Sequence, residues 1–292
     1  MTGNPIPEDV FEQYRSLMFG ISYRVLGSVA DAEDTIQETW LRWNQIDQSL
    51  VIDPRGYLVR AVTRTSIDQL RRAKARREQY IGSWLPEPLL TGSGAADAAV
   101  HDDSISMAIL VMLESTSPLE RAVFVLREVF GFSYPEVAQA VGRSESAVRQ
   151  LGHRAKTHMQ QRRLRFQPEP QESRRVTERF LAACLGGDLS ELMEVLAPDV
   201  TLWVDAYGTS EGARQPIHGA RTIGEYLKSI AHRYPDGIQL RYAEFNSDPG
   251  GLLVADGELY AAVSVELLPT GLVTAIRVVR TPEKLTHLQV PV

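Results

Sequence analysis

SYPEVAQAVGRSESAVRQLGHRAKTHM, residues 133–159, is the stretch that decides the fold of the central part of this chain. Ser133 and Glu136 form the pattern of a capping box, and Gly142 ends the helix that follows. A second helix starts at Ser144, with apolar residues recurring every three or four positions and basic residues on its other faces. Two short helices with a glycine in the turn between them, the second one basic, are typical of a helix-turn-helix. An ordinary helical hairpin with a solvated charged face is the alternative that this stretch leaves open.

Charge is segregated along the 292 residues, although the net charge is −6 and the hydrophobic content is 43%. Residues 54–80 contain eight basic and two acidic side chains, and residues 143–165 contain seven basic and one acidic. From residue 172 onward the chain is acidic, with 11 basic and 16 acidic residues. The length suits two or three domains, and any DNA contact must come from the two basic clusters rather than from a uniformly basic surface.

The composition also indicates the cellular compartment of the protein and excludes some kinds of site. The single cysteine, Cys184, lies in the apolar run FLAACL, where we expect a core residue; it excludes an internal disulfide and a cysteine-based metal site. The first residues lack a basic-then-apolar signal, and the longest apolar run, 108–113, is far short of the roughly 20 residues of a membrane span. We expect a cytoplasmic protein without membrane contacts, metal or cofactor.

Two helices are predicted at the start of the chain, over residues 11–26 and 31–43. In the second, DAEDTIQETWLRW, a stripe that includes Trp40 and Trp43 is expected to be buried. The residues left on the other faces are Asp34, Gln37, Glu38 and Leu41. This surface is acidic and polar with one apolar member, and a plain amphipathic helix of a bundle explains it equally well.

A long helix is predicted after the break at residues 53–54, and its C-terminal half is rich in arginine. Tyr57 followed by many arginines suits phosphate neutralisation together with base stacking, although part of this charge can serve the helix dipole. Residues 81–104 form a linker in which Trp84 predicts docking onto another part of the protein. Helices over 105–114 and 119–130 complete a four-helix domain with the helix-turn-helix.

The last part of the chain changes period from helical to strand-like. Helices are predicted over 174–185, 189–196 and 223–234, and strands over 200–205, 239–245, 251–254, 259–267 and 272–279. The turns are predicted at Pro249-Gly250-Gly251, Asp256-Gly257 and Pro269-Thr270-Gly271. Helices first and an antiparallel sheet afterwards indicate an α+β domain.

The segments DAEDTIQETWLRW, DPRGYLVRAVTRTSIDQLRR and SPLERAVFVLREVFGFSYPEVAQAVGRSESAVRQLGHRAK resemble the two characteristic domains of extracytoplasmic-function sigma factors of bacterial RNA polymerase. The resemblance implies region 2 over residues 1–80, a linker over 81–104 and region 4 over 105–165. A regulatory domain follows over 172–292. It further implies two partners, promoter DNA and the polymerase core with its β′ clamp and β flap.

The resemblance also assigns roles to individual residues. Asp34, Gln37, Glu38 and Leu41 would meet the β′ clamp. The residues expected at the −10 element are Arg60, Arg64, Thr65, Arg71, Arg72, Lys74, Arg76 and Arg77. The residues expected at the −35 element are Arg143, Ser144, Glu145, Ser146, Arg149, Gln150, Arg154 and Lys156. Arg149 and Gln150 are the candidates for base contacts, and Arg143, Arg154 and Lys156 for phosphates. Thr65 stands where many members have asparagine, so the base preference at −10 stays open.

The C-terminal domain is similar to the SnoaL-like, nuclear-transport-factor-like cone fold. Candidates for its pocket mouth are Trp203, Asp205, Tyr207 and His218. An aspartate in an apolar cavity can act as a general base, but no acid and base pair at a telling spacing appears. We therefore favour a pocket filled by side chains, or one that binds a ligand without chemistry, over an enzyme site.

Sigma factors of the sigma factor J type resemble the whole chain. In that group a tryptophan-leucine-proline linker and two C-terminal motifs accompany a fused domain thought to replace a separate anti-sigma factor. The positions that match, and that we expect to be regulatory, are Trp84, Leu85, Pro86, Asp205, Tyr207, Gly208, Pro282, Glu283, Lys284 and Leu285. The Asp-Gly-Gly-Gly loop of the group is eroded here to Asp205-Ala206-Tyr207-Gly208, which puts the function of the loop in doubt.

The sequence thus predicts an RNA polymerase sigma factor that directs promoter-specific initiation and is controlled by its fused C-terminal domain. Two other classes stay open. A DNA-binding repressor or activator would need no core polymerase, although the helix over 31–43 has no role in such a protein. A bifunctional protein would combine DNA binding with catalysis in the cone domain.

Overall fold

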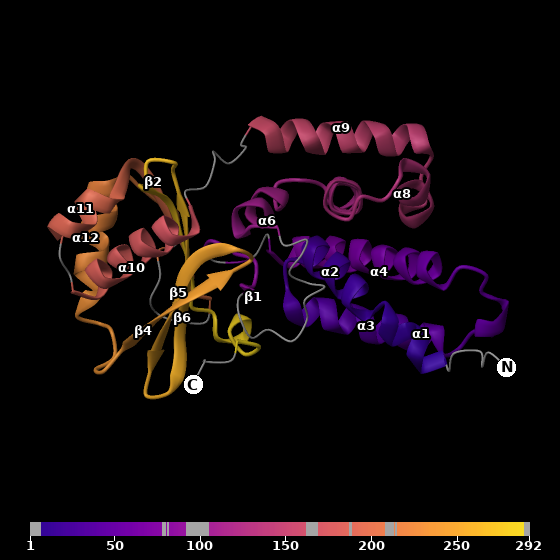
Figure 1. Ribbon diagram of the computed structural model, residues 1–292, viewed down its shortest axis with the longest axis horizontal. Coiled ribbons are helices and arrows are strands. Elements are labelled where there is room, and N and C mark those ends of the chain that lie inside the picture. The colour runs from indigo at the N-terminus through magenta and orange to yellow at the C-terminus, as the bar shows by residue number, and fades with distance from the viewer. Residues whose placement is uncertain are drawn as a thin grey trace. The chain divides into compact units, whose positions relative to one another are not determined.

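The computed structural model describes residues 7–77, 80, 82–91, 105–161, 169–186, 189–207, 213 and 215–288 (Figure 1). These residues form two compact units. The helical unit comprises Met1–Glu78, Ala96–Ile105 and Ile109–Arg163, and the α+β unit comprises Gln79–Ala95, Ser106–Ala108 and Leu164–Val292. The predicted fold class, all-α segments followed by an α+β domain, is confirmed.

The first helices of the helical unit are α1 (Pro7–Gln13), α2 (Arg15–Leu26), α3 (Val29–Trp43), the 3-10 turn η1 (Gln48–Leu50) and α4 (Pro54–Arg77). The single helix predicted over 11–26 is interrupted at Tyr14, which has φ −107° and ψ 6°. The expected burial of Trp40 is wrong, since its side chain is 39% exposed. Trp40 lies at the edge of the apolar stripe, and Thr35 and Thr39 are buried at the other edge.

The second group of helices comprises α6 (Met107–Leu113), α7 (Pro118–Phe124), the π-helical turn η2 (Val125–Val129), α8 (Tyr134–Val141) and α9 (Glu145–Gln161). The capping box between Ser133 and Glu136 is formed, and Gly142 ends α8 with φ 66°. That left-handed conformation favours glycine and turns the chain sharply into α9. The helix-turn-helix predicted from the sequence is therefore present.

The α+β unit contains α10 (Pro170–Gly186), α11 (Leu189–Val195), β2 (Leu196–Asp205), β3 (Ile217–His218), α12 (Ala220–Ala231), β4 (Gln239–Phe245), β5 (Asp248–Ala255), β6 (Glu258–Leu267), β7 (Val273–Val279) and the 3-10 turn η3 (Pro282–Lys284). The strand order is β1-β4-β5-β6-β7-β2-β3, with β1 (Leu90–Thr91) supplied by the predicted linker. The edge strands β1 and β3 were not predicted because two residues show no alternation.

The sheet is not purely antiparallel, as the sequence had suggested, because β2 and β7 pair in parallel. A turn was also misplaced. Asn246 and Ser247, with φ 55° and 62°, make the turn between β4 and β5, whereas Pro249-Gly250-Gly251 lies inside β5. A Cβ atom at Gly250 would lie 2.1 Å from the carbonyl oxygen of Val263, so this glycine serves close strand packing rather than a turn.

Helices α10, α11 and α12 pack on one face of this sheet, and the core between them is apolar (Figure 1). Its fully buried members include Phe180, Leu192, Leu202, Ile223 and Val265. Helices covering one side of a curved sheet give the cone arrangement expected from the sequence. Among the helices that the structure describes, none has both the length and the apolar character that a membrane span requires.

Candidate functional site

The N-terminal half of α9 presents exposed polar and basic side chains. Ser144 caps the helix by accepting from the Ala147 amide (3.3 Å), and Arg149 and Gln150 lie exposed one turn further along. Arg149 pairs with Glu145 on its own helix at 2.5 Å and lies over the ring of Tyr134 at 4.3 Å. Exposed pairs of this kind are worth at most about 1 kcal/mol, so DNA can displace them easily.

The flanking basic residues of the helix-turn-helix are exposed as well. Lys156 makes one contact with Glu128, 3.2 Å away, and both side chains are partly in water. Arg143 and Arg154 are likewise exposed. The predicted −35 residues therefore lie together on the surface, apart from Glu145, which is half-buried.

The basic residues of α4 fall into two groups. Arg71, Arg72 and Arg76 are exposed, as expected for residues that contact nucleic acid. Arg64 instead donates from Nε to the carbonyl oxygen of Ala140 (3.1 Å) and from Nη2 to that of Gln139 (3.0 Å). These carbonyls lie in the last turn of α8, whose dipole favours a cation. Arg64 thereby joins α4 to the helix-turn-helix.

Thr65 and Arg60 are less accessible than the sequence suggested. Thr65 is 5% exposed, and its hydroxyl accepts a hydrogen bond from Arg42 at 3.2 Å. Arg60 is half-buried. In this arrangement Thr65 is too enclosed to meet a base, because its side chain faces the interior of the helical unit.

Lys74 and Arg77, also predicted to bind DNA, belong to a charge cluster around Glu114. Arg77 donates to the Glu114 carboxylate (2.6 Å) and to the carbonyl of Leu26 (2.9 Å), and Lys74 donates to the Glu114 carbonyl (3.0 Å). Arg121 is fully buried, ion-pairs with Glu114 and donates to the carbonyl of Arg24 at 3.0 Å. The cluster ties the ends of α2 and α4 to α6 and α7.

Burial and ion pairing act on the pKa values of this cluster in opposite directions. Burial alone raises the pKa of Glu114, but Arg121 and Arg77 outweigh it and hold that pKa below its ordinary value. Burial lowers the pKa of Lys74 and of Arg77. Sequence reasoning missed Glu114 and Arg121, because neither lies in a motif and their partners are distant in the chain.

The surface of α3 expected to meet the polymerase is exposed at Asp34, Gln37 and Leu41, and Glu38 pairs with Arg42 on the same helix. Asp34 and Gln37 border an open groove of about 430 Å³. Trp40 also lines it. The half-exposed Trp40 therefore joins this surface, although the sequence had placed it in the core.

An enclosed polar site of the α+β unit is centred on the carboxylate of Asp205, which is fully buried. It accepts hydrogen bonds from the Leu85 amide (2.7 Å), the Thr281 hydroxyl, the Lys284 ammonium (2.6 Å) and the Tyr80 hydroxyl. Lys284 also donates to the carbonyl of Leu85 at 2.5 Å. Both peptide groups of Leu85 are thus held by one ion pair; we call this group of five residues the Asp205 hub.

Aromatic rings surround the Asp205 hub. The Lys284 ammonium lies 4.1 Å from the ring centre of Trp84, and Tyr80 stacks on Tyr207 at 4.6 Å. The pKa of Tyr80 is raised, by burial first and by the Asp205 hydrogen bond second, so its hydroxyl stays a donor. Sequence reasoning missed Tyr80, since a lone tyrosine after an arginine run gives no signal.

The remaining residues of the two C-terminal motifs differ in exposure. Leu285 is buried beside Lys284, whereas Pro282 and Glu283 point to solvent. Gly208 lies outside the described residues. Thr281 stands at the first position of the terminal motif Thr281-Pro282-Glu283-Lys284-Leu285, and its hydroxyl supplies one of the bonds to Asp205.

The part of the linker that the structure describes, residues 82–91, belongs to the α+β unit. Leu85 and Pro86 are buried, and β1 pairs antiparallel with β4. Asn246 exchanges two hydrogen bonds with Leu89, one through its amide at 2.9 Å and one through its side chain at 3.1 Å. The predicted docking of the linker is therefore seen directly.

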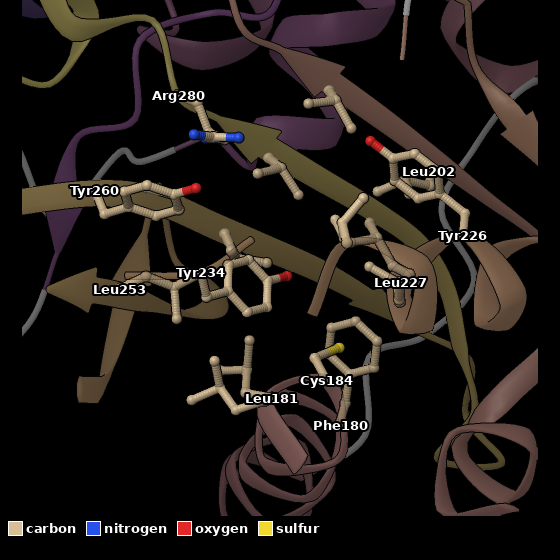
Figure 2. Close-up of a pocket in the computed structure, with 17 residues that line it drawn as sticks. Phe180, Leu181, Cys184, Leu202, Tyr226, Leu227, Tyr234, Leu253, Tyr260 and Arg280 are labelled. Atoms are coloured by element: carbon tan, nitrogen blue, oxygen red, sulfur yellow. The ribbon is translucent and has the colours of Figure 1, made fainter. Parts of the chain in front are cut away.

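An apolar cavity of about 50 Å³ lies between the helices and the sheet of this unit (Figure 2). Its lining includes Leu202 and Val204 but not Trp203, Asp205 or His218, so the predicted pocket residues are wrong for this cavity. The reason is the alternation of β2 and β3, which turns successive side chains to opposite faces, so that Ile217 and not His218 packs on the core. Trp203 lies under the guanidinium of Arg277, 5.5 Å from its ring centre.

The described residues contain no group of three or more His, Cys, Asp or Glu placed to hold a metal ion. Cys184 lines the cavity, and burial raises the pKa of its thiol.

Comparison with known proteins identifies the helical segments. The family model for sigma-70 region 2 matches residues 10–76, and that for sigma-70 region 4 matches residues 106–159. The ECF RNA polymerase sigma factor SigJ of Mycobacterium tuberculosis is 35% identical over 289 residues, which cover 94% of this chain and 92% of the relative. This chain belongs to the extracytoplasmic-function RNA polymerase sigma factors.

Two further likenesses refine this assignment of the sigma factor. The probable ECF sigma factor SigI of M. tuberculosis is 36% identical over 196 residues, covering 66% of this chain and 68% of the relative. The crystal structure of M. tuberculosis SigJ matches with a TM-score of 0.75 and 33% identity, over 96% of this chain and 98% of that chain. The likeness to SigJ includes the α+β unit, and the predicted family and fold are confirmed. As a sigma factor, the protein directs promoter-specific initiation of transcription.

Proposed function

We propose that the α+β unit of this sigma factor controls initiation by holding the linker through the Asp205 hub. The observation that carries the proposal is the buried ion pair of Asp205 and Lys284, in which the carboxylate accepts from the Leu85 amide and the ammonium donates to the Leu85 carbonyl. The domain limits given by the resemblance, with region 2 ending near residue 80 and region 4 starting near 105, leave this segment as the connection between the two promoter-binding regions. A held linker restricts how far those regions separate.

In the proposed complex, α9 enters the major groove of the −35 element. Arg149 and Gln150 reach base edges, because they lie exposed one turn from the helix start. Arg143, Arg154 and Lys156 neutralise phosphates and set the register. The surface of α3 around Asp34, Gln37, Glu38 and Leu41 docks on the β′ clamp, and region 4 meets the β flap.

The −10 element is assigned to α4. Arg71, Arg72 and Arg76 are available as they stand, but Arg64, Lys74 and Arg77 must first leave their carbonyl and carboxylate partners. Because those partners lie in the segment assigned to region 4, the observed arrangement of the helical unit occludes part of its own DNA-binding helix. Core polymerase and promoter DNA in the cytoplasm supply the energy to open it.

The free-energy cost of breaking the Asp205 hub is large enough for the hub to control the linker. Removing one partner of a buried ion pair costs about 3–5 kcal/mol, because the other charge is left without compensation. A change of that size is enough to move an equilibrium between held and released linker almost completely from one side to the other. The apolar cavity of the same unit is the candidate site for a small-molecule ligand.

The test is run-off transcription with purified core polymerase and the upstream region of this gene. We expect Asp205→Ala to raise the yield of transcript by releasing the linker, and Arg149→Ala to lower it by weakening promoter recognition. Glu283→Ala, at an exposed position in the same motif, is the matched control and should leave the yield unchanged. Equal yields from the unaltered chain and Asp205→Ala would refute control through the hub.

A further inference from the structure

The cavity of the α+β unit is apolar at one end and polar at the other. Figure 2 shows Phe180, Leu181 and Cys184 at one end and Arg280 with Tyr260 at the opposite end. The guanidinium of Arg280 lies 4.2 Å from the ring centre of Tyr260. Within the described part of the chain, the lining includes no carboxylate, and Arg280 is its one charged side chain.

Tyrosine hydroxyls add neutral donors to the lining, and Figure 2 shows Tyr260 on the side of Arg280. Tyr226, Tyr234 and Tyr260 all line the cavity. The pKa of Tyr234 is raised, by burial first and then by Cys184 and Tyr260, so this phenol keeps its proton at physiological pH. A guanidinium beside protonated hydroxyls is suited to hold a carboxylate.

The size of the cavity limits the body of the ligand. Its volume of about 50 Å³ is room for a few water molecules at about 10–15 Å³ each, whereas a cavity of about 150 Å³ accepts one benzene ring. Tyr226, Tyr234 and Leu185 are half-buried and line the cavity, so their side chains can turn outward. An occupant must therefore be compact and must displace these side chains.

We propose that this cavity binds a small carboxylate with an apolar body of about one ring, its carboxylate at Arg280 and its body against Phe180 and Leu181. The apolar walls supply affinity in proportion to the area they cover, and Arg280 selects the anion over a neutral molecule of equal shape.

The cavity and the Asp205 hub lie on opposite faces of the sheet, at the ends of β2 and β7. Val204 and Arg280 line the cavity, and the residues that follow them, Asp205 and Thr281, hold the linker. Successive residues of an extended chain point to opposite faces. The Arg280 amide also donates to the Asp205 carbonyl at 2.7 Å, next to the parallel pairing of β2 with β7.

A ligand that moves the Arg280 side chain therefore acts on the peptide that positions Thr281 and Asp205. Binding in the cavity changes the strength with which the linker is held, and the ligand becomes the signal to which this sigma factor responds. This second step rests on the proposed control through the hub, whereas the binding step does not.

The binding step is tested by titration calorimetry of the full chain with benzoate, cyclohexanecarboxylate and hexanoate, each paired with its neutral amide. We expect at least one carboxylate to bind at millimolar or lower concentration. Arg280→Gln should weaken it by about tenfold or more, the value of one charged hydrogen bond, and leave the amide unchanged. Arg233→Gln, at an exposed position of the same unit, is the control and should bind as the unaltered chain does.

A variant that fills the cavity gives a second test. Ala261→Leu enlarges a fully buried residue of the cavity wall and should abolish binding of acid and amide alike. Binding of none of the three acids, or binding that Arg280→Gln leaves unchanged, would overturn the proposed site; the second result holds even if Ala261→Leu fails to fold.

The coupling step is read from hydrogen exchange at the Leu85 amide with and without the bound acid. A several-fold change that is absent in Arg280→Gln supports the coupling. A ligand that binds but leaves Leu85 exchange unchanged refutes the coupling and leaves the site standing. Rapid Leu85 exchange in the unliganded chain would instead refute control through the hub.

Discussion

Helix α4 carries eight Lys and Arg residues and helix α9 carries three, and the two helices hold these charges differently. In α4, Arg64, Lys74 and Arg77 are bonded to backbone carbonyls and to Glu114. In α9, Arg149 pairs with Glu145 on its own helix, and both side chains are about half exposed. Charge density in the sequence therefore indicates a nucleic-acid surface, but the partners that each charge already has in the fold decide how readily it can bind DNA.

The difference also separates two energetic roles. A buried cation with carbonyl and carboxylate partners fixes the arrangement of helices, because breaking one contact leaves a charge without compensation. An exposed pair contributes little to folding and exchanges readily for phosphate. The comparison predicts that variants at buried charges change stability, whereas variants at exposed charges change DNA binding.

The largest effect is expected for Glu114→Gln. It leaves Arg77 and Arg121 without their carboxylate, and Arg121 is fully buried. The free energy of unfolding of the full chain should fall by about 3–5 kcal/mol in urea denaturation. Glu128→Gln breaks the exposed pair with Lys156 and should cost less than about 1 kcal/mol. Equal losses for the two variants would contradict the comparison.

Lys284→Met should cost about 3 kcal/mol, because Asp205 keeps its other donors but loses its cation. The same variant should expose the linker, so limited proteolysis near Trp84 should become faster. The control is Glu283→Gln at the exposed neighbour, which should change neither quantity by a measurable amount.

A pH-dependent effect is expected at Asp248, which is 1% exposed and lies beside Arg277, Glu266 and the Ala108 amide. Burial, more than Glu266, raises its pKa from 3.8 to about 7 against the opposing effect of Arg277. The folded chain therefore binds this proton more tightly than the unfolded chain. The contribution of this proton to the free energy of unfolding is complete below about pH 4, falls as the pH rises toward 7 and is lost above that value.

In Asp248→Asn this pH-dependent decline should be absent. The free energies of unfolding of the unaltered protein and the variant should therefore change relative to each other by about 2–4 kcal/mol between pH 4 and pH 7. Thermal unfolding across that range measures it, and parallel curves for the two proteins would show that Asp248 does not titrate there.

The smallest effect on stability, within about 0.5 kcal/mol, is expected for Arg149→Ala. Its effect should instead appear in DNA binding. The binding free energy should weaken by about 1–3 kcal/mol for the cognate −35 element and change little for unrelated duplex. Arg154→Ala should instead weaken all duplexes alike and reduce the salt dependence by about one phosphate contact. If Arg149→Ala weakened binding to the cognate and the unrelated duplex equally, Arg149 would contact a phosphate rather than a base.

Local patterns predicted much of this fold. The capping box at Ser133, the glycine stop at Gly142 and the start at Ser144 were read correctly, because each depends on neighbours within a few residues. The docked linker was predicted from Trp84, and the structure adds Tyr80 and Thr281 as donors to the Asp205 carboxylate that accepts from Leu85. Those contacts join segments far apart in the sequence, and spacing carries no information about them.

The wrong expectations share one physical cause, since each required knowledge of packing across elements. Trp203, Asp205 and His218 were placed at the pocket because they are polar or aromatic near strand ends, but the pleat of β2 turns Leu202 and Val204 inward instead. Gly250 was read as a turn, whereas it permits close approach of β5 and β6. Trp40 was placed in the core although it lies at the edge of its stripe.

The central claim, that the Asp205 carboxylate holds the linker, is tested most directly by hydrogen exchange at the Leu85 amide in the free, full chain. The account predicts slow exchange in the unaltered protein and an acceleration of tenfold or more in Asp205→Ala, with Glu283→Ala unchanged. Exchange of Leu85 at the rate of an unstructured peptide, or equal protection with and without the Asp205 carboxylate, would contradict it.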